Sequence, residues 1–191
     1  MAKYENIRAL AKKQLQAATE SSDRWKAFLR TAAIAYNYSF PNQLLIHEQN
    51  PTATAVADIN YWNKNAGRWV KRGAHGIAVL DTHANSSRLR YLFDISDTVP
   101  KHEIPEALPW AVTDQNWRPV WDKIVADNQA DSIQSALLML ATGYVAQRRA
   151  MFMTALEKAV DGSSLQWAKP DEQRQLFLQI VTQSCLYMAA L

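Results

Sequence analysis

The hydrophobic period of this chain changes twice along the sequence, and this change limits the fold more than any other feature. Apolar residues recur at three- and four-residue steps before about residue 66, occur in short β-rich runs from 69 to 95, and return to helical spacing after 116. Helical spacing indicates amphipathic helices, and alternation indicates half-buried strands. The pattern predicts an α+β fold, with N-terminal helices packed on a small, mostly antiparallel sheet and a C-terminal helical region after it.

Local start and stop signals place the helices that come before the strands. The first helix covers residues 4–19, and the second begins with Asp23 as its N-cap. Another starts at Ser39, because the Phe-Pro pair that follows puts a proline in the first turn, where its missing N–H has no helical acceptor. Asp58 is expected to cap a short helix, which Gly67 ends in a left-handed conformation.

Three short runs rich in β-forming residues follow, at residues 69–72, 77–82 and 88–95. Glycines or polar stretches separate them. In the last run, apolar side chains alternate with a mixed set, so one face is apolar and the other is mixed. Residues 96–115 carry three of the seven prolines and have no clear period, which predicts a linker or an extended crossover.

The pattern therefore divides the chain into an α+β domain over residues 1–98, a linker or crossover over 99–115, and a helical extension over 116–191. The extension has no motif that assigns a role, and it either packs on the first domain or docks another one. Its apolar pattern runs to the last residue, so we expect the chain to be a piece of a longer protein. Helices are predicted over 116–128, 131–160 and 171–190. In the helix over 131–160, Gly143 is the expected weak point. Its expected core positions are Ile133, Leu137, Leu140, Tyr144, Phe152, Leu156 and Ala159.

Cysteine use and charge limit the compartment and the partner. The single cysteine, Cys185, excludes a disulfide within the chain and a Cys-based zinc cluster. With no signal-peptide core and no run long enough to cross a bilayer, we expect a cytoplasmic protein that does not enter a membrane. Residues 1–99 hold 13 Lys or Arg against 8 Asp or Glu, giving +5, whereas residues 100–191 hold 8 against 10, giving −2. This asymmetry is a weak indication of a polyanionic partner.

The densest chemical signal is the run from residue 61 to 76, which has four cations, aromatic residues between them and no acidic residue. Cations attract phosphates, and aromatic faces stack on unpaired bases, with about 1 to 3 kcal/mol per stack. Glycines let the backbone approach a phosphate closely. The alternative is that the tryptophans lie in the core and the cations are simply solvated. The residues concerned are Trp62, Lys64, Arg68, Trp69, Lys71, Arg72, Gly73 and Gly76.

No residue pattern typical of a catalytic or metal site is found. His47 and the glutamate after it begin like H-E-x-x-H, but Pro51 stands where the second histidine is required. A G-x-S-x-G nucleophile elbow is missing, Asp94 and Asp97 suit strand-end and turn roles, and Cys185 suits a buried thiol. We expect no enzymatic activity, no catalytic residue, no metal and no cofactor. His75, His83 and His102 are expected on the surface.

Two stretches resemble a known family: YSFPNQLLIHEQNPTATAVADINYWNKNAGRWVKRGAHGIAVLD at residues 38–81 and LRYLFDISDT at 89–98. They are similar to the ArdC-type N-terminal domain of antirestriction proteins and of very large proteins of conjugative transposons and plasmids. The resemblance covers about residues 22–98, roughly 40% of the chain. It implies an α+β domain that binds single-stranded DNA and protects or handles the incoming strand during conjugation. The metalloprotease module of full-length members has no counterpart here, so the resemblance implies no proteolysis.

The positions that match the family are Tyr38, Asn42, Gln43, Trp62, Arg68, Val70, Lys71, Gly73 and Gly76. Asn42 and Gln43 either bind bases or bond to local backbone, while Tyr38 and Val70 are expected in the core. We expect a single-stranded DNA-binding accessory domain of a larger mobile-element protein. The alternative is a protein-interaction module whose C-terminal helices dock another domain or a partner in conjugation or DNA processing. The expected nucleic-acid-binding residues are Asn42, Gln43, Trp62, Lys64, Arg68, Trp69, Lys71, Arg72, Gly73, His75 and Gly76.

Overall fold

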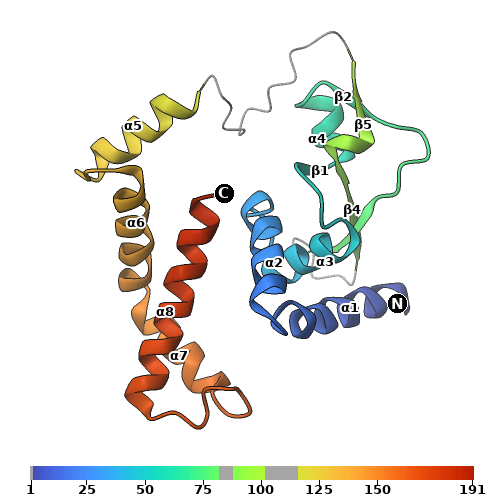
Figure 1. Cartoon of the computed structure of the whole chain (residues 1–191). Helices are drawn as coiled ribbons and strands as arrows, with labels where there is room; N and C mark the ends of the chain where they lie inside the picture. Colours follow the sequence, from blue (N-terminus) through green and yellow to red (C-terminus); the bar gives the residue numbers. More distant parts are fainter. Residues whose placement is uncertain (1, 82–87, 102–115) are drawn as a thin grey trace. The chain divides into compact units, whose positions relative to one another are not determined.

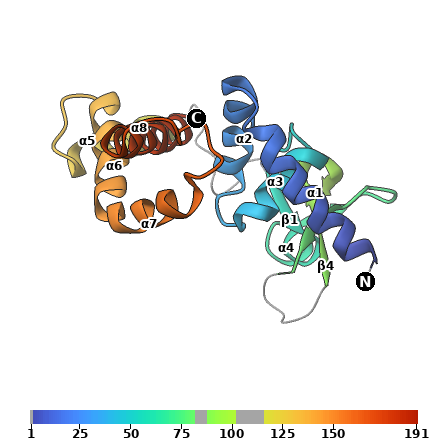
Figure 2. The same cartoon turned by 90° about the horizontal axis from the view of Figure 1, so that it is seen from below.

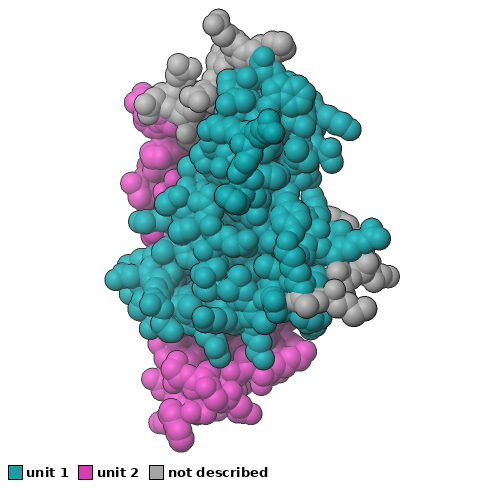
Figure 3. All heavy atoms as spheres, turned by 90° about the vertical axis from the view of Figure 1, so that its right-hand side faces the viewer, with its two compact units in different colours: residues 1–106 teal, residues 107–191 magenta. Residues whose placement is uncertain are grey.

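The computed structural model describes residues 2–81, 88–101 and 116–191, and the chain forms two compact units, residues 1–106 and 107–191 (Figures 1 and 3). The first unit combines helices with antiparallel strands and the second contains helices, so the predicted α+β fold is confirmed. Unit 1 contains α1 (Ala2–Ala18), α2 (Ser22–Ile34), α3 (Phe40–Gln49), β1 (Val56–Asp58), α4 (Ile59–Lys64), β2 (Arg68–Val70), β3 (Ile77–Leu80), β4 (Leu89–Asp94), the 3₁₀ helix η1 (Ile95–Asp97) and β5 (Thr98–Pro100). Unit 2 contains α5 (Trp117–Asp127), α6 (Ile133–Gln147), α7 (Arg149–Ala159) and α8 (Pro170–Ala189).

Side-chain caps explain where two of the helices in unit 1 begin. Asp58 precedes α4 and accepts the N–H of Tyr61 at 2.9 Å, as predicted. The predicted N-cap at Asp23 is wrong. Ser21 is the N-cap of α2 and accepts the N–H of Arg24, whereas Asp23 lies in the first turn, where the helix dipole favours its negative charge. Gly67, after α4, has a φ of 61°, the left-handed conformation expected for it.

The strands form two separate antiparallel sheets. A three-stranded sheet has the order β1-β4-β3, and a two-stranded ribbon joins β2 to β5. The antiparallel arrangement is therefore confirmed, but β1 and β5 were not predicted. Because β5 pairs with β2, unit 1 includes the first residues of the segment expected to be a linker. Thr82, at the end of the second predicted strand, lies outside the described residues.

The core of unit 1 lies between α1, α3 and the three-stranded sheet. α3 packs against α1, α2 and β3 (Figures 1 and 2). Leu45 and Ile46 of α3 are fully buried and share a cluster with Val79 and Leu92. Leu92 belongs to the mixed face of β4, and Tyr91 on the apolar face is 41% exposed. The mixed face of β4 is thus the one that carries the most deeply buried side chain.

Two amide side chains of α3 bond directly to the backbone of β3. Asn42 donates to the carbonyl of Leu80 and accepts its N–H, both at 2.9 Å. Gln49 makes the same pair of bonds with Ala78, also at 2.9 Å. The two amides are seven residues apart, which is about two helical turns, so they share one face of α3. Ala78 and Leu80 are two residues apart in β3, so their backbone N–H and C=O groups point toward the same edge of the sheet, where the two amides bond to them.

Asp94, at the end of β4, ties the segment before β1 to the turn that follows β4. Its carboxylate is buried and accepts the N–H groups of Thr54 at 2.8 Å, Ala55 at 3.0 Å and Ser96 at 3.0 Å. Burial by itself would raise the pKa of Asp94, but the hydrogen bonds from Ser96, Ala55 and Thr54 outweigh it and lower the pKa. The folded chain therefore favours the ionised carboxylate.

Unit 2 has a thin core. α6 and α8 lie side by side and run in opposite directions (Figure 1). The predicted single helix over 131–160 is wrong, because Arg148, with φ −107° and ψ 12°, separates α6 from α7, and both of these helices contact α8. The break is not at Gly143, which lies within α6. Of the predicted core positions Leu156 is buried, but Leu140, Tyr144 and Ala159 are exposed; the buried side chains described in this unit are Ala136, Ala141, Val145 and Leu156.

Candidate nucleic-acid interface

The two-stranded ribbon of β2 and β5 exposes an aromatic side chain. Trp69 of β2 pairs with Val99 of β5, and these side chains are 52% and 41% exposed. Thr98, the next residue along β5, is buried, as expected when side chains alternate between the two faces of a strand. The same alternation places Lys71 and Lys101 on the side of Trp69 and Val99. We call these four residues the ribbon face.

Both lysines of the ribbon face are held by hydrogen bonds, and one of them lies over the tryptophan ring. The Nζ of Lys101 lies 3.8 Å from the centre of a Trp69 ring and also donates to the carbonyl of Asn63 in α4. Lys71 donates its Nζ to the carbonyl of Ser96 at 2.7 Å and remains exposed. Lys71 stands opposite Asp97, whose carbonyl accepts its N–H at 2.8 Å. A cation therefore covers one face of the Trp69 ring.

Three further cations of the acid-free run lie on or next to this ribbon in the chain: Lys64 ends α4, which packs against β2, Arg68 begins β2, and Arg72 follows Lys71. Lys64 and Arg72 are exposed, and no side-chain partner is found for either within the described parts of the chain. Arg68 is half-buried, and its Nε donates to the hydroxyl of Thr98 at 2.6 Å, so it braces the ribbon from the other side. Lys64 and Arg72 are thus free to meet a phosphate, whereas Arg68 already has a structural contact.

Trp62 is a correction to the predicted site. Its side chain is completely buried in α4, and its ring N–H donates to the carbonyl of Phe93 at 2.9 Å. A base cannot stack on a ring that no solvent reaches. The core alternative is therefore right for Trp62 and does not apply to Trp69.

The amides of Asn42 and Gln43 are also committed within the protein. Asn42 is 4% exposed and bonds to Leu80, as described above. Gln43 donates to the carbonyls of Ala35 and Tyr38, both at 3.1 Å, and so closes the end of α2. Bonding to local backbone, one of the two expectations, is found for Gln43, whereas the buried amide of Asn42 bonds to a strand 38 residues away and has no group left for a base.

The two glycines of the run have different roles. Gly73 has a φ of 85° in an exposed turn, where a left-handed conformation favours glycine. Gly76 is needed for packing: a Cβ there would lie 3.0 Å from the Cβ of Tyr91 and 3.1 Å from the Cζ of Phe93. His75, between them, is exposed. Close approach of β4 therefore accounts for Gly76 without a ligand.

Sequence reasoning missed Val99 and Lys101. The three prolines between residues 96 and 115 led to the expectation of a linker, although Pro100 only ends the short strand β5. A signal was present: a valine and a lysine two residues apart repeat the spacing of Trp69 and Lys71. This spacing indicates a shared face only when β2 and β5 are known to pair.

The described residues contain no cluster of three or more His, Cys, Asp or Glu side chains that could hold a metal ion. The Nδ1 of His47 lies 2.8 Å from the hydroxyl of Thr31, and burial lowers the pKa of His47 despite the opposing charge of Glu48. Burial raises the pKa of Cys185, which favours the thiol over the more reactive thiolate. His83 and His102 lie outside the described residues.

None of the described helices is long and apolar enough to cross a membrane. Comparisons with models of protein families, with curated proteins and with solved structures found no match.

Proposed function

We propose that unit 1 binds single-stranded DNA through the ribbon face, and that the chain is a non-enzymatic, cytoplasmic accessory domain of a larger mobile-element protein. The observation that carries the proposal is the half-exposed Trp69 with Lys101 over its ring and the exposed Lys71 two residues along the chain. A single strand offers bases that can stack on an aromatic ring and phosphates that attract cations, and this surface offers both partners. The resemblance to ArdC-type domains at residues 38–81 and 89–98 supports the same function.

The proposed contacts follow from what each side chain leaves free. One ring face of Trp69 is covered by Lys101, so a base stacks on the other face. Lys64 and Arg72, which have no partner in the described part of the chain, and the exposed Lys71 contact phosphates. With three or four phosphates neutralised, the logarithm of the affinity falls against the logarithm of the salt concentration with a slope of about −2 to −3.

Fluorescence anisotropy of a labelled oligo-dT strand tests this proposal. We expect Trp69→Ala to weaken binding about tenfold, since one base stack is worth about 1–3 kcal/mol. The double variant Lys71→Glu/Arg72→Glu should reduce the steepness of the salt dependence. Trp167→Ala is the matched control, because Trp167 is an 86% exposed tryptophan in unit 2. Affinity that does not depend on salt, or an equal loss in both tryptophan variants, would refute the proposal.

A second candidate function, docking of another protein, is favoured by the exposed apolar side chains of α6. Leu138, Met139 and Tyr144 are each between 45% and 51% exposed, and a shallow groove beside them is lined by Leu138, Met139, Thr142, Gly143 and Ala146. Apolar patches of this kind mark interaction surfaces in many soluble proteins.

Sedimentation at increasing protein concentration tests whether this apolar surface associates. If it does, we expect Met139→Glu to reduce association at both low and high salt, because burial of apolar surface depends little on screening. Lys158→Glu, at an exposed position of α7, is the control for added negative charge. Association that disappears at high salt, or that both variants reduce equally, would argue against docking through α6.

A further inference from the structure

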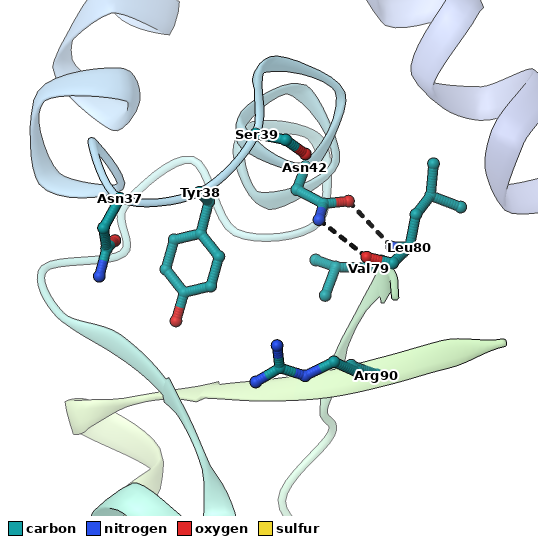
Figure 4. A pocket seen from close by; sticks show the side chains of 7 residues that line it. All are labelled: Asn37, Tyr38, Ser39, Asn42, Val79, Leu80 and Arg90. Atoms are coloured by element: carbon teal, nitrogen blue, oxygen red, sulfur yellow. Dashed lines mark hydrogen bonds between the residues drawn. The ribbon is translucent and has the colours of Figure 1, made fainter. Parts of the chain in front are cut away.

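Unit 1 contains a cavity of about 270 Å³ that none of the ribbon residues lines. Asn37, Tyr38 and Ser39, just before α3, form one wall, and Arg90 of β4 forms the opposite wall (Figure 4). Figure 4 shows the guanidinium of Arg90 facing the hydroxyl of Tyr38 across this space. Asn42, whose amide bonds to Leu80, closes the cavity beside β3.

Two polar side chains of the cavity wall, Asn37 and Ser39, have no hydrogen-bond partner among the described residues, and a third, Arg90, uses only part of its donors. The side chains of Asn37 and Ser39 are exposed, and neither makes a hydrogen bond within the described residues; the Ser39 hydroxyl does not cap α3. Arg90 uses Nη2 to bind a carboxylate oxygen of Asp58 at 2.8 Å. A guanidinium carries five N–H groups, so its remaining donors can still bind a ligand.

Asp58 fixes the position of this guanidinium. Its second carboxylate oxygen accepts the N–H of Tyr61 at the start of α4, so the carboxylate cannot turn freely. The Arg90 guanidinium is therefore held at Nη2, and its other N–H groups are available to a ligand. An arginine oriented in this way suits an anion with several oxygens, because a guanidinium presents parallel N–H donors.

The neighbouring tyrosine adds a neutral hydroxyl to the site. Burial is the main cause of the raised pKa of Tyr38; the charge of Arg90 opposes the rise, and Asp58 and Tyr61 add to it. The phenol is therefore protonated at neutral pH, and its hydroxyl donates to the carbonyl of Val56 at 3.0 Å. No side chain that lines the cavity is negatively charged. An anion there meets several neutral polar groups and one guanidinium, whose charge is shared with Asp58 just outside the cavity.

We propose that this cavity is a binding site for a phosphate group, held by Arg90 with help from Ser39 and Asn37. The volume lies just below the range of about 300–1,000 Å³ found for drug-sized molecules, so the cavity suits a smaller ligand. A terminal phosphate of a DNA strand and a free mononucleotide share this chemistry. The site does not depend on the ribbon face, since neither Trp69 nor any of the free cations around it lines the cavity.

NMR titration of the wild-type chain with inorganic phosphate is the first test. We expect saturable shifts of the Arg90 side-chain N–H signals and of the backbone amides of Asn37, Tyr38 and Ser39. The same titration with dTMP, and with oligo-dT carrying a 5′-phosphate or a 5′-hydroxyl, separates the two sources. Tighter binding of dTMP than of the 5′-phosphorylated strand identifies a free nucleotide, and the reverse order identifies a strand end.

Variants decide whether the cavity residues themselves hold the phosphate. Arg90→Gln should weaken phosphate binding about tenfold or more, because a charge-assisted bidentate contact is lost. Arg88→Gln is the matched control, since Arg88 is exposed, precedes β4 and does not line the cavity. If Arg90→Gln does not fold, Asn37→Ala/Ser39→Ala at two exposed positions should weaken binding severalfold. The proposal is overturned if no saturable shifts occur in the wild type, or if Arg88→Gln weakens binding as much as the cavity variants do.

Discussion

We expect Trp62→Ala to lower the free energy of unfolding of unit 1 by about 3–5 kcal/mol, one of the largest effects that a single substitution can have in this chain. The side chain is completely buried, so its removal leaves a cavity beside β4. The substitution also removes the donor that the carbonyl of Phe93 bonds to at 2.9 Å. Hydrogen–deuterium exchange of peptides from residues 89–94 measures the loss within unit 1.

Trp69→Ala is the matched comparison in the same acid-free run. Its ring is half-exposed and has Lys101 over one face, and such contacts at exposed sites contribute about 0.5–1 kcal/mol. We therefore expect little change in exchange for Trp69→Ala and a large increase for Trp62→Ala. Equal exchange in the two variants would mean that the distinction between a core tryptophan and a surface tryptophan is wrong.

Asp94→Ala should lower the free energy of unfolding by about 2–4 kcal/mol. Thr54 and Ser96 are exposed, so their N–H groups can bind water when the carboxylate is removed, but the N–H of Ala55 is buried and loses its acceptor. Asp97→Ala, three residues further on, is the control, with an expected change within about 0.5 kcal/mol. Urea unfolding of the wild type and the two variants measures these free energies. A loss of stability in Asp97→Ala as large as that in Asp94→Ala would contradict the role given to the Asp94 carboxylate.

The same carboxylate predicts how stability depends on pH. The pKa of Asp94 is lower in the folded chain than its ordinary value of 3.8, so its contribution is fully present above that value. The contribution is lost as the pH falls through the lower pKa of the folded state. The difference in unfolding free energy between the wild type and Asp94→Asn should therefore shrink as the pH falls below 3.8. A difference that does not change with pH would contradict the conclusion that folding lowers the pKa of Asp94.

The elements that the sequence predicted correctly are those with signals in neighbouring residues. Asp58 and Gly67 bound α4, a proline begins α3, and alternation identifies β4. The two strands that were missed, β1 and β5, have three residues each, too few to show a period; β2 is as short, but glycines at 67 and 73 delimit its run. They exist because β4 and β2 pair with them, and pairing across tens of residues leaves no local signal.

The candidate site was predicted in part for the same reason. The composition of residues 61–76 shows that cations and aromatic residues occur together, but it does not show which tryptophan points inward. That depends on the packing of α4 against β4, which buries Trp62 and leaves Trp69 exposed. In β4 the mixed face carries the buried Asp94. Its carboxylate can be buried because it accepts the backbone N–H groups of Thr54 and Ala55, about forty residues earlier. The composition of β4 does not reveal that hydrogen bonds from a distant segment allow this carboxylate to be buried.

The amides of Asn42 and Gln49 have a consequence for how the three-stranded sheet can meet other chains. β3 is an edge strand, and an open edge invites strand addition, domain swapping and amyloid-like stacking. Here the outward N–H and C=O groups of Ala78 and Leu80 are already occupied by side chains of α3. An incoming strand would have to displace four hydrogen bonds at this edge before it formed any. β-Augmentation of this sheet is therefore disfavoured at β3, and a peptide that added a strand to it would have to do so beside β1.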